Sequence, residues 1–200
     1  RPDSRRVLFG SGWILETIRG FSFEVGPDAF FQVHTVMAER MFERICREAD
    51  RQESRRILEL YAGSGVLATL LASPGRTVQG FESDAAAVSA ARRNIRRNRV
   101  EGVQITERRV EEVRADAFPD SPDLVIADPP RAGLSDQALR LLFELRPTRL
   151  ILVSCQPAIL ARDLQRWLAP GGYEIDWIQP FDLFPQTTHV ETVVSLSRNR

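Results

Sequence analysis

The sequence of 200 residues contains no lysine, only two cysteines and no long hydrophobic run. No segment approaches the roughly 18 consecutive apolar residues of a membrane-spanning helix, and the first residues lack the pattern of a signal peptide. Cys46 and Cys155 lie far apart, so they make no disulfide framework and cannot ligate an iron–sulfur cluster. We therefore expect a cytoplasmic protein with no metal and no membrane partner.

The chain has no excess of charge of either sign. All 27 basic residues are arginine, and they balance 27 acidic residues to a formal net charge of zero. A neutral chain does not attract nucleic acid strongly over its whole surface. Arginine suits contacts with phosphates and bases, but genomic base composition explains the complete lack of lysine better. With 43% hydrophobic residues, the chain can bury one sizeable globular core.

Short apolar runs alternate with helix-like segments along most of the chain. The runs cover residues 56–60, 78–81, 103–106, 123–127 and 150–154, and helix-like segments between or after them cover residues 84–98, 135–146 and 157–168. This alternation is typical of βαβ units and predicts an α/β fold with a mostly parallel sheet of about seven strands. The strand-like segments 173–184 and 189–197 have no helix between them, which predicts an antiparallel C-terminal pair that closes one side of the sheet.

The part of the chain before this alternation has a different pattern. Strand-like residues around Arg19 and Gly20 predict a hairpin, and residues 35–50 place apolar side chains at helical spacing. Cys46 lies on that apolar stripe, so we expect it in the core. We divide the chain into an N-terminal hairpin and lead-in, residues 1–34, and a larger domain, residues 35–200.

Ligands of such sheets bind beyond the carboxyl ends of the strands. After the first run, Gly63 and Gly65 in "ELYAGSGVLA" allow a tight turn and close approach of the backbone to a ligand. Glu82 ends the next run about 20 residues later, where an acid binds ribose hydroxyls. These features indicate a nucleoside-containing cofactor, either a nicotinamide dinucleotide or S-adenosylmethionine. Glu82 could instead favour the start of the next helix, although Asp84 is also placed for that.

The fourth run ends in Asp128-Pro129-Pro130-Arg131. Consecutive prolines remove two backbone donors and stiffen the loop, so we expect Asp128 to be held rigidly at the sheet edge. A stiff polar loop beside a cofactor suits the binding of a planar base. Asp-Pro-Pro followed by an aromatic residue is associated with methylation of exocyclic amines, but here Arg131 follows.

The fifth run ends just before Cys155, and Glu191 lies among strand-like residues of the last segment. Cys155 is either a small buried residue or a thiol placed to act on a ligand. A lone glutamate on a strand is usually solvated. A thiol, a carboxylate and a cofactor site at one sheet edge would, however, form a nucleophile and base pair. A helix that starts after Cys155 would lower the pKa of its thiol.

Five segments, in this order, resemble motifs of the S-adenosylmethionine-dependent RNA uracil-5-methyltransferases, which make 5-methyluridine in tRNA and rRNA. They are "FFQVH", "LELYAGSG", "DPPRAGL", "SCQPAILARDL" and "DLFPQTTHVETV", and the resemblance extends from about Phe30 to Ser197. It implies a Rossmann-like class I methyltransferase fold, S-adenosylmethionine as cofactor and RNA as substrate.

The resemblance also assigns roles to individual residues. It implies that Cys155 is the nucleophile and Glu191 the base, with Arg131 and Pro129 as candidates on the substrate side. The residues implied to bind S-adenosylmethionine are Gln32, Tyr61, Gly63, Gly65, Glu82 and Asp128. The chain departs from the family pattern at His34, Glu59, Ala62, Arg109 and Gln156. These departures bear on substrate choice and rate.

The implied chemistry is covalent catalysis. The thiolate of Cys155 attacks C6 of uracil, C5 becomes nucleophilic and takes the methyl group, and Glu191 removes the C5 proton before the thiolate leaves. The target base must leave its stack to reach such a site. A nicotinamide dehydrogenase would not need Cys155, and an exocyclic-amine methyltransferase would survive its loss. A cytosine-5 methyltransferase usually has proline where Ser154 precedes the thiol.

RNA recognition is the least determined feature of the sequence. Members of the family commonly carry an RNA-binding barrel ahead of the catalytic domain, and the roughly 30 residues before Gln32 leave no room for one. The chain is therefore expected to be a catalytic domain alone, a minimal enzyme, or a cofactor-binding protein with little turnover. The arginines of "ARRNIRRNR" spread around a helix, which favours a solvated surface over phosphate contacts.

Overall fold

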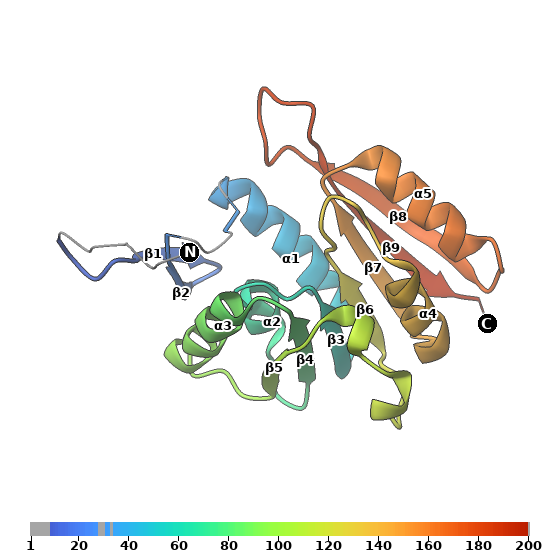
Figure 1. The fold of residues 1–200 in the computed structure, drawn as a ribbon, viewed down its shortest axis with the longest axis horizontal. Helices are drawn as coiled ribbons and strands as arrows, with labels where there is room; N and C mark the ends of the chain where they lie inside the picture. Colours follow the sequence, from blue (N-terminus) through green and yellow to red (C-terminus); the bar gives the residue numbers. More distant parts are fainter. Residues whose placement is uncertain (1–8, 28–30, 33, 200) are drawn as a thin grey trace.

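A seven-stranded sheet forms the larger part of the computed structural model, which describes residues 9–27, 31–32 and 34–199 (Figure 1). The strand order is β5-β4-β3-β6-β7-β9-β8. The strands are β3 (Arg56–Leu60), β4 (Thr77–Glu82), β5 (Val103–Glu107), β6 (Leu124–Ala127), β7 (Arg149–Ser154), β8 (Tyr173–Phe181) and β9 (Glu191–Arg198). The five strands from β5 to β7 are parallel, whereas β9 pairs antiparallel with both β7 and β8. The predicted mostly parallel sheet with an antiparallel C-terminal pair is confirmed.

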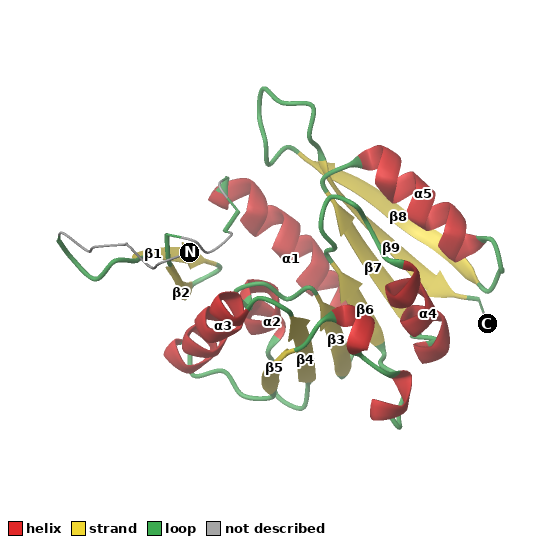
Figure 2. Ribbon diagram, in the orientation of Figure 1, coloured by secondary structure: helices red, strands yellow, loops and turns green. Residues whose placement is uncertain are grey.

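Helices cover both faces of this sheet (Figure 2). They are α1 (Thr35–Arg51), α2 (Val66–Leu71), α3 (Ala85–Arg97), α4 (Asp136–Leu145) and α5 (Pro157–Leu168), with two short 3₁₀ turns, η1 (Val110–Glu112) and η2 (Ala115–Ala117). One apolar core joins α1, α2 and α3 to one face of the sheet, and a second core joins α4 and α5 to the other face. Cys46 is buried in the first core, as predicted.

The apolar runs of the central strands supply both cores at once. Along β7, Ile151 and Val153 belong to the core under α1, whereas Leu150 and Leu152 belong to the core under α4 and α5. Successive side chains of a strand point to opposite faces, so a strand covered by helices on both faces is apolar at every position. This explains why the runs are continuous and not alternating.

The N-terminal segment forms the predicted hairpin, with strands β1 (Ile14–Ile18) and β2 (Phe21–Val25). Arg19 and Gly20 both have positive φ, 50° and 80°, which is the geometry of a two-residue hairpin turn. Ile18 and Phe23 are fully buried in the core that α1 and α3 share. The hairpin thus packs on the larger unit, and the division at residue 34 stays a prediction.

Helix α3 binds the free edge of β2 through two side-chain amides. Asn98 Oδ1 accepts the Ser22 N–H at 2.9 Å, and Asn94 Oδ1 accepts the Glu24 N–H at 2.8 Å. The buried Glu24 carboxylate also pairs with Arg93 at 3.1 Å and with Arg97. These pairs lower the pKa of Glu24, with the Arg97 hydrogen bond as the largest cause. Two of the arginines considered for RNA contact therefore attach the hairpin instead.

Candidate active site

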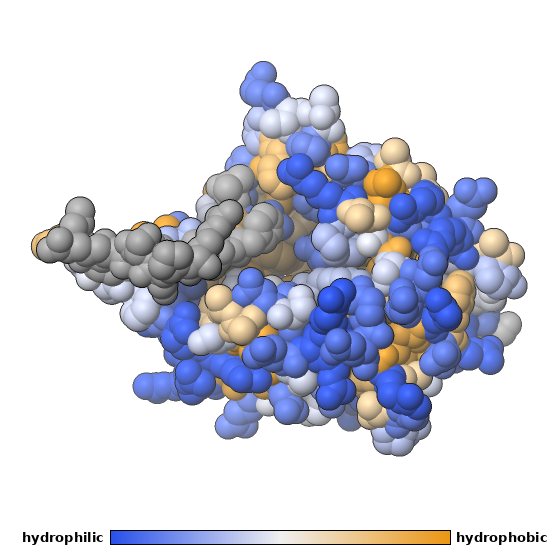
Figure 3. Space-filling model, in the orientation of Figure 1, coloured by the Kyte–Doolittle hydropathy of each residue, from blue (hydrophilic) through white to orange (hydrophobic). Residues whose placement is uncertain are grey.

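The candidate site lies at the carboxyl edge of the parallel strands, where the loops after β3, β4, β6 and β7 meet. The space-filling view shows that this face of the molecule is hollowed near its centre (Figure 3). Parallel strands bring their C-terminal ends to one edge, so residues separated by almost 100 positions become neighbours there.

The loop after β3 turns through three residues with positive φ: Tyr61 at 64°, Gly63 at 53° and Gly65 at 72°. A side chain at Gly65 would place its Cβ 2.8 Å from the Cβ of Ala91, so glycine lets the loop lie against α3. A Cβ at Gly63 would meet nothing within 4 Å, which leaves this backbone open to a ligand. Tyr61 holds a conformation that costs about 1 kcal/mol or more for a residue with a Cβ.

The Glu82 carboxylate fixes this glycine loop from the end of β4. One oxygen accepts the Gly63 N–H at 2.9 Å, and the other accepts the N–H groups of Ser83 at 2.7 Å and Asp84 at 2.8 Å. Asp84 is the N-cap of α3, where it accepts two backbone N–H groups. Asp84 is therefore the side chain that caps α3, whereas Glu82 binds the glycine loop and the backbone just before the helix. The Ser83 hydroxyl also lies 3.4 Å from Oε1, whereas Oε2 accepts only the Gly63 N–H and so retains a lone-pair position for a ligand hydroxyl.

Two buried acceptors have no hydrogen-bond partner within the described part of the chain. They are Gln32 Oε1, just before α1, and Glu59 Oε2 in β3. Burial, reinforced by the charges of Asp128 and Glu82, raises the pKa of Glu59 to about 8. An unpaired buried acceptor costs about 1–3 kcal/mol, so both atoms are suited to receive donors from a bound ligand.

Asp128 follows β6 directly, and its N–H lies 3.4 Å from the carbonyl oxygen of Leu60 in β3. Its side chain is exposed to solvent at the sheet edge, although the protein around it removes part of its hydration. This partial desolvation raises its pKa to about 6. Asp128 acts in turn on the pKa values of Glu59 and Glu191, which places three carboxyls close together.

Cys155 and Glu191 face each other across β7 and β9. Ser154, the last residue of β7, pairs with Thr192, so the next step of this antiparallel register sets Cys155 opposite Glu191. Glu191 is only 3% exposed and is also paired with Phe181 of β8. Burial first, and then the Asp128 charge, raise its pKa to about 8. The predicted nucleophile and base are thus brought together.

The thiol of Cys155 has a raised pKa, which corrects the prediction that the following helix lowers it. Burial is the largest cause, the Glu191 charge adds to it, and the Arg131 charge opposes it. Helix α5 has Pro157 at its first position, which has no N–H to direct at a thiolate. Burial and the neighbouring carboxylate therefore outweigh the groups that lower the thiol pKa.

Arg131 lies in the loop after Pro129 and Pro130, with its side chain exposed. Its charge acts on Cys155, so the loop brings the predicted substrate-side arginine to the thiol. A hydrogen bond from the Gly133 N–H to the Pro130 carbonyl, at 2.7 Å, closes a turn in this loop. Asp128, Arg131, Cys155 and Glu191 therefore form one electrostatically coupled group.

The buried Asn94 in α3 escaped the sequence analysis. Its Nδ2 donates to the Ser64 carbonyl in the glycine loop at 3.1 Å, while its Oδ1 holds Glu24 in the hairpin. The only signal in the sequence is that Asn94 and Asn98 are four residues apart, which places two amides on one face of a helix.

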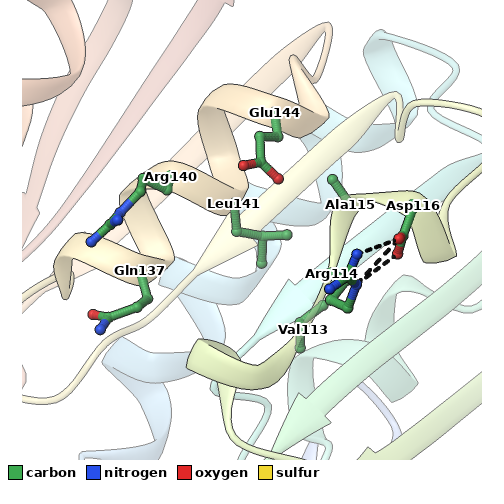
Figure 4. Close-up of a pocket in the computed structure, with 8 residues that line it drawn as sticks. All are labelled: Val113, Arg114, Ala115, Asp116, Gln137, Arg140, Leu141 and Glu144. Atoms are coloured by element: carbon green, nitrogen blue, oxygen red, sulfur yellow. Dashed lines mark hydrogen bonds and ion pairs between the residues drawn. The ribbon is translucent and has the colours of Figure 1, made fainter.

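Two hollows of the surface lie away from this edge. One, of about 430 Å³, lies between η2 and α4 and is lined by residues such as Arg114, Asp116 and Glu144 (Figure 4). The other, of about 410 Å³, lies at the opposite end of the strands, near Arg56 and Thr148. Neither is lined by a predicted site residue.

Within residues 9–199, apart from 28–30 and 33, no group of three or more His, Cys, Asp or Glu side chains is arranged to hold a metal ion. No helix among these residues is long and apolar enough to cross a membrane.

The sequence of the chain is similar to those of known RNA methyltransferases. The model of the tRNA (uracil-5-)-methyltransferase family matches residues 1–120 and 106–199. An uncharacterized RNA methyltransferase of Gloeobacter violaceus is 40% identical over 97% of this chain and 42% of its own length. One from Enterococcus faecalis is 37% identical over 98% of this chain and 43% of its own length. The chain therefore spans less than half the length of these relatives.

Solved structures give the same picture. The tRNA (uracil-54, C5)-methyltransferase of Pyrococcus abyssi, in complex with S-adenosyl-L-homocysteine, is 33% identical with a TM-score of 0.83 over 94% of this chain and 45% of that chain. The magnesium protoporphyrin IX methyltransferase of Synechocystis is 14% identical with a TM-score of 0.64 over 86% of each chain, which shows a shared fold alone. The predicted class I methyltransferase fold is confirmed.

Proposed function

Because the chain belongs to the tRNA (uracil-5-)-methyltransferase family, we propose that it transfers a methyl group from S-adenosylmethionine to C5 of a uridine in RNA. The observation that carries this proposal is the position of Cys155 opposite Glu191, beside Asp128 and Arg131. Two free cysteines, one of them at the site, agree with action in the reducing cytoplasm.

The residues at the strand ends fit S-adenosylmethionine. The open backbone at Gly63 admits a ligand, and Glu82 retains acceptor capacity for ribose hydroxyls. The buried acceptors Gln32 Oε1 and Glu59 Oε2 can accept hydrogen bonds from the cofactor, and Asp128 supplies another carboxyl at the same sheet edge. A cluster of desolvated carboxyls attracts a cation, and this cofactor carries a sulfonium and an ammonium group. We assign Tyr61 and Gly65 to the same site as the rest of its loop.

The chemistry then follows from Cys155 and Glu191. Cys155 as thiolate forms a bond to C6 of the uracil, and the electrons of the C5–C6 double bond move into the ring enolate. S-adenosylmethionine, when bound, supplies an electrophilic methyl group for C5. Glu191 then removes the proton from C5, and the bond from C6 to the Cys155 sulfur breaks to restore the thiolate. A pKa of about 8 makes Glu191 a stronger base than an ordinary carboxylate.

Arg131 has two tasks in this scheme. Its charge favours the thiolate of Cys155, because it opposes the effects of burial and of Glu191 on that thiol. It is also exposed, so it can bind a phosphate or the enolate oxygen of a flipped-out base. Pro129 stiffens the loop on the substrate side. We propose RNA, as tRNA or rRNA, for the substrate.

Methyl transfer to RNA tests the proposal. The protein, incubated with S-adenosylmethionine labelled in the methyl group and with tRNA or rRNA, should yield labelled 5-methyluridine on digestion to nucleosides. Cys155→Ala should abolish the product while leaving cofactor binding intact. Product that persists in Cys155→Ala, or label in an exocyclic methylamine, would exclude the covalent uracil chemistry.

A further inference from the structure

The loop that carries Arg131 is attached to the helix that follows Cys155. Residues 130–133 form a tight turn, in which Arg131 and Ala132 occupy the two central positions. The turn packs against α5, which begins two residues after Cys155. The nucleophile and the support of this loop therefore lie on one continuous strand–helix unit.

Two adjacent residues of α5 make the attachment. Asp163 is 3% exposed, and its Oδ2 accepts the Leu134 N–H at 2.8 Å. Arg162 Nη2 donates to the Ala132 carbonyl oxygen at 2.8 Å and to Asp163 Oδ1 at 2.7 Å. Helix α5 thus binds the backbone carbonyl before Gly133 and the backbone N–H after it.

Gly133 allows this close contact. Its φ is +80°, and a Cβ there would lie 2.3 Å from Asp163 Oδ2 and 2.6 Å from Arg162 Nη2. Any side chain would push the turn away from α5. The spacing between the turn and the helix is therefore set by glycine on one side and, on the other, by the buried Asp163 and its ion pair with Arg162.

We propose that Asp163 and Arg162 are positioning residues that hold Arg131, through the 130–134 turn, at a fixed place beside Cys155. This inference rests on the proposed function for the role of Cys155 as nucleophile. Among the described residues, the Asp163 carboxylate forms no hydrogen bond with the Cys155 thiol or with the exposed guanidinium of Arg131. Its influence on the thiol therefore passes through the position of the loop.

The direction in which the Cys155 thiol pKa changes in an Asp163 variant distinguishes positioning of the loop from a direct charge effect of Asp163. Asp163→Ala removes a negative charge, which by direct interaction would favour the Cys155 thiolate and lower the thiol pKa. If the loop is released, Arg131 moves away and the thiol pKa rises instead. Asp163→Asn removes the same charge but keeps an oxygen that accepts the Leu134 N–H, so it should raise the thiol pKa less.

The experiment measures alkylation of Cys155 by iodoacetamide as a function of pH, with the modified peptide identified by mass. Arg131→Ala should raise the thiol pKa by about one unit and slow alkylation at neutral pH about tenfold. Asp163→Ala should slow it several-fold and have no further effect in the Arg131→Ala background. Asp136→Ala is the control: it removes an exposed carboxylate of α4 that pairs with Arg166 of α5, and it should leave the alkylation rate unchanged.

Gly133→Ala provides a second test that changes no charge. It should slow alkylation as Asp163→Ala does, and it decides the matter if Asp163→Ala does not fold. Faster or unchanged alkylation in a folded Asp163→Ala or Gly133→Ala variant would overturn the proposal, as would additive effects of Asp163→Ala and Arg131→Ala. Alkylation needs no RNA, so this test is independent of the methyl-transfer assay. Methyl transfer that persists in Cys155→Ala would refute the proposed function, but it would not refute the positioning of Arg131.

Discussion

Glu191 should destabilise the folded protein at neutral pH, and Glu191→Gln should remove that destabilisation. Burial and the Asp128 charge raise the pKa of Glu191 from 4.5 to about 8. Between these values the folded state holds a proton that the unfolded state has released, so stability falls as pH rises. The stabilising contribution is complete below pH 4.5 and is lost as pH rises through 8. One pKa unit corresponds to about 1.36 kcal/mol, so the titration of Glu191 should lower the free energy of unfolding by about 3 kcal/mol between pH 5 and pH 8.

Urea denaturation at pH 5, 6.5 and 8 measures this effect. Glutamine keeps the shape of the side chain without a charge, so Glu191→Gln should exceed the wild type in unfolding free energy by about 1–3 kcal/mol at pH 8 and by less than about 1 kcal/mol at pH 5. Glu174→Gln on the exposed side of β8 is the control and should change stability by less than about 0.5 kcal/mol at each pH. Parallel pH profiles for wild type and Glu191→Gln would refute the claim that this carboxyl is desolvated.

Three more predictions concern the cofactor side of the site. The sulfonium charge of S-adenosylmethionine should favour the ionised forms of Glu59 and Asp128, so its binding should release protons from these carboxyls. Calorimetry in buffers of different ionisation enthalpy should show that S-adenosylmethionine releases more protons on binding than the uncharged thioether S-adenosylhomocysteine does. Equal proton release by the two ligands would contradict this. Glu82→Ala removes the acceptor of three N–H groups and should weaken cofactor binding at least about tenfold, whereas Glu107→Ala, its neighbour in β5, should not. Asn94→Ala leaves a buried N–H unpaired and should cost about 1–3 kcal/mol in thermal unfolding. It should also weaken cofactor binding through the glycine loop, and unchanged affinity would count against that link.

The sequence predicts the sheet well because burial on both faces leaves a periodic signal. Continuous apolar runs such as 150–154 locate the central strands within one or two residues of β7 and its neighbours. Glycines at Gly63 and Gly65 mark the loop because only a few residues adopt positive φ at low cost. Tyr61, which also has positive φ, gives no such signal.

The thiol of Cys155 shows what the sequence cannot supply. A helix start is a local feature, and it predicts a lower pKa for the thiol. The raised pKa comes from burial and from Glu191, which lies 36 positions away in the chain and is brought opposite by the register of β9. Such through-space effects depend on the fold and not on neighbouring letters.

The positioning residues are hidden for the same reason. Asp163 and Asn94 are polar residues inside helices, where exposure to solvent is the usual interpretation. Their partners, the Leu134 N–H and the Glu24 N–H, lie 29 and 70 positions away. The sequence placed Glu82 at the end of a strand, but only the structure separates its hydrogen bonds from those of the helix cap Asp84.

Trapping of the covalent intermediate tests the central claim most directly. The protein is mixed with S-adenosylmethionine and an RNA that contains 5-fluorouridine, and denaturation-resistant complexes are analysed by mass. Fluorine at C5 cannot leave as a cation, so the intermediate should remain attached. We predict one adduct that maps to Cys155, carries one added methyl group and is absent in Cys155→Ser. Failure to form it, by protein that methylates the uridine form of the same RNA, would contradict the account.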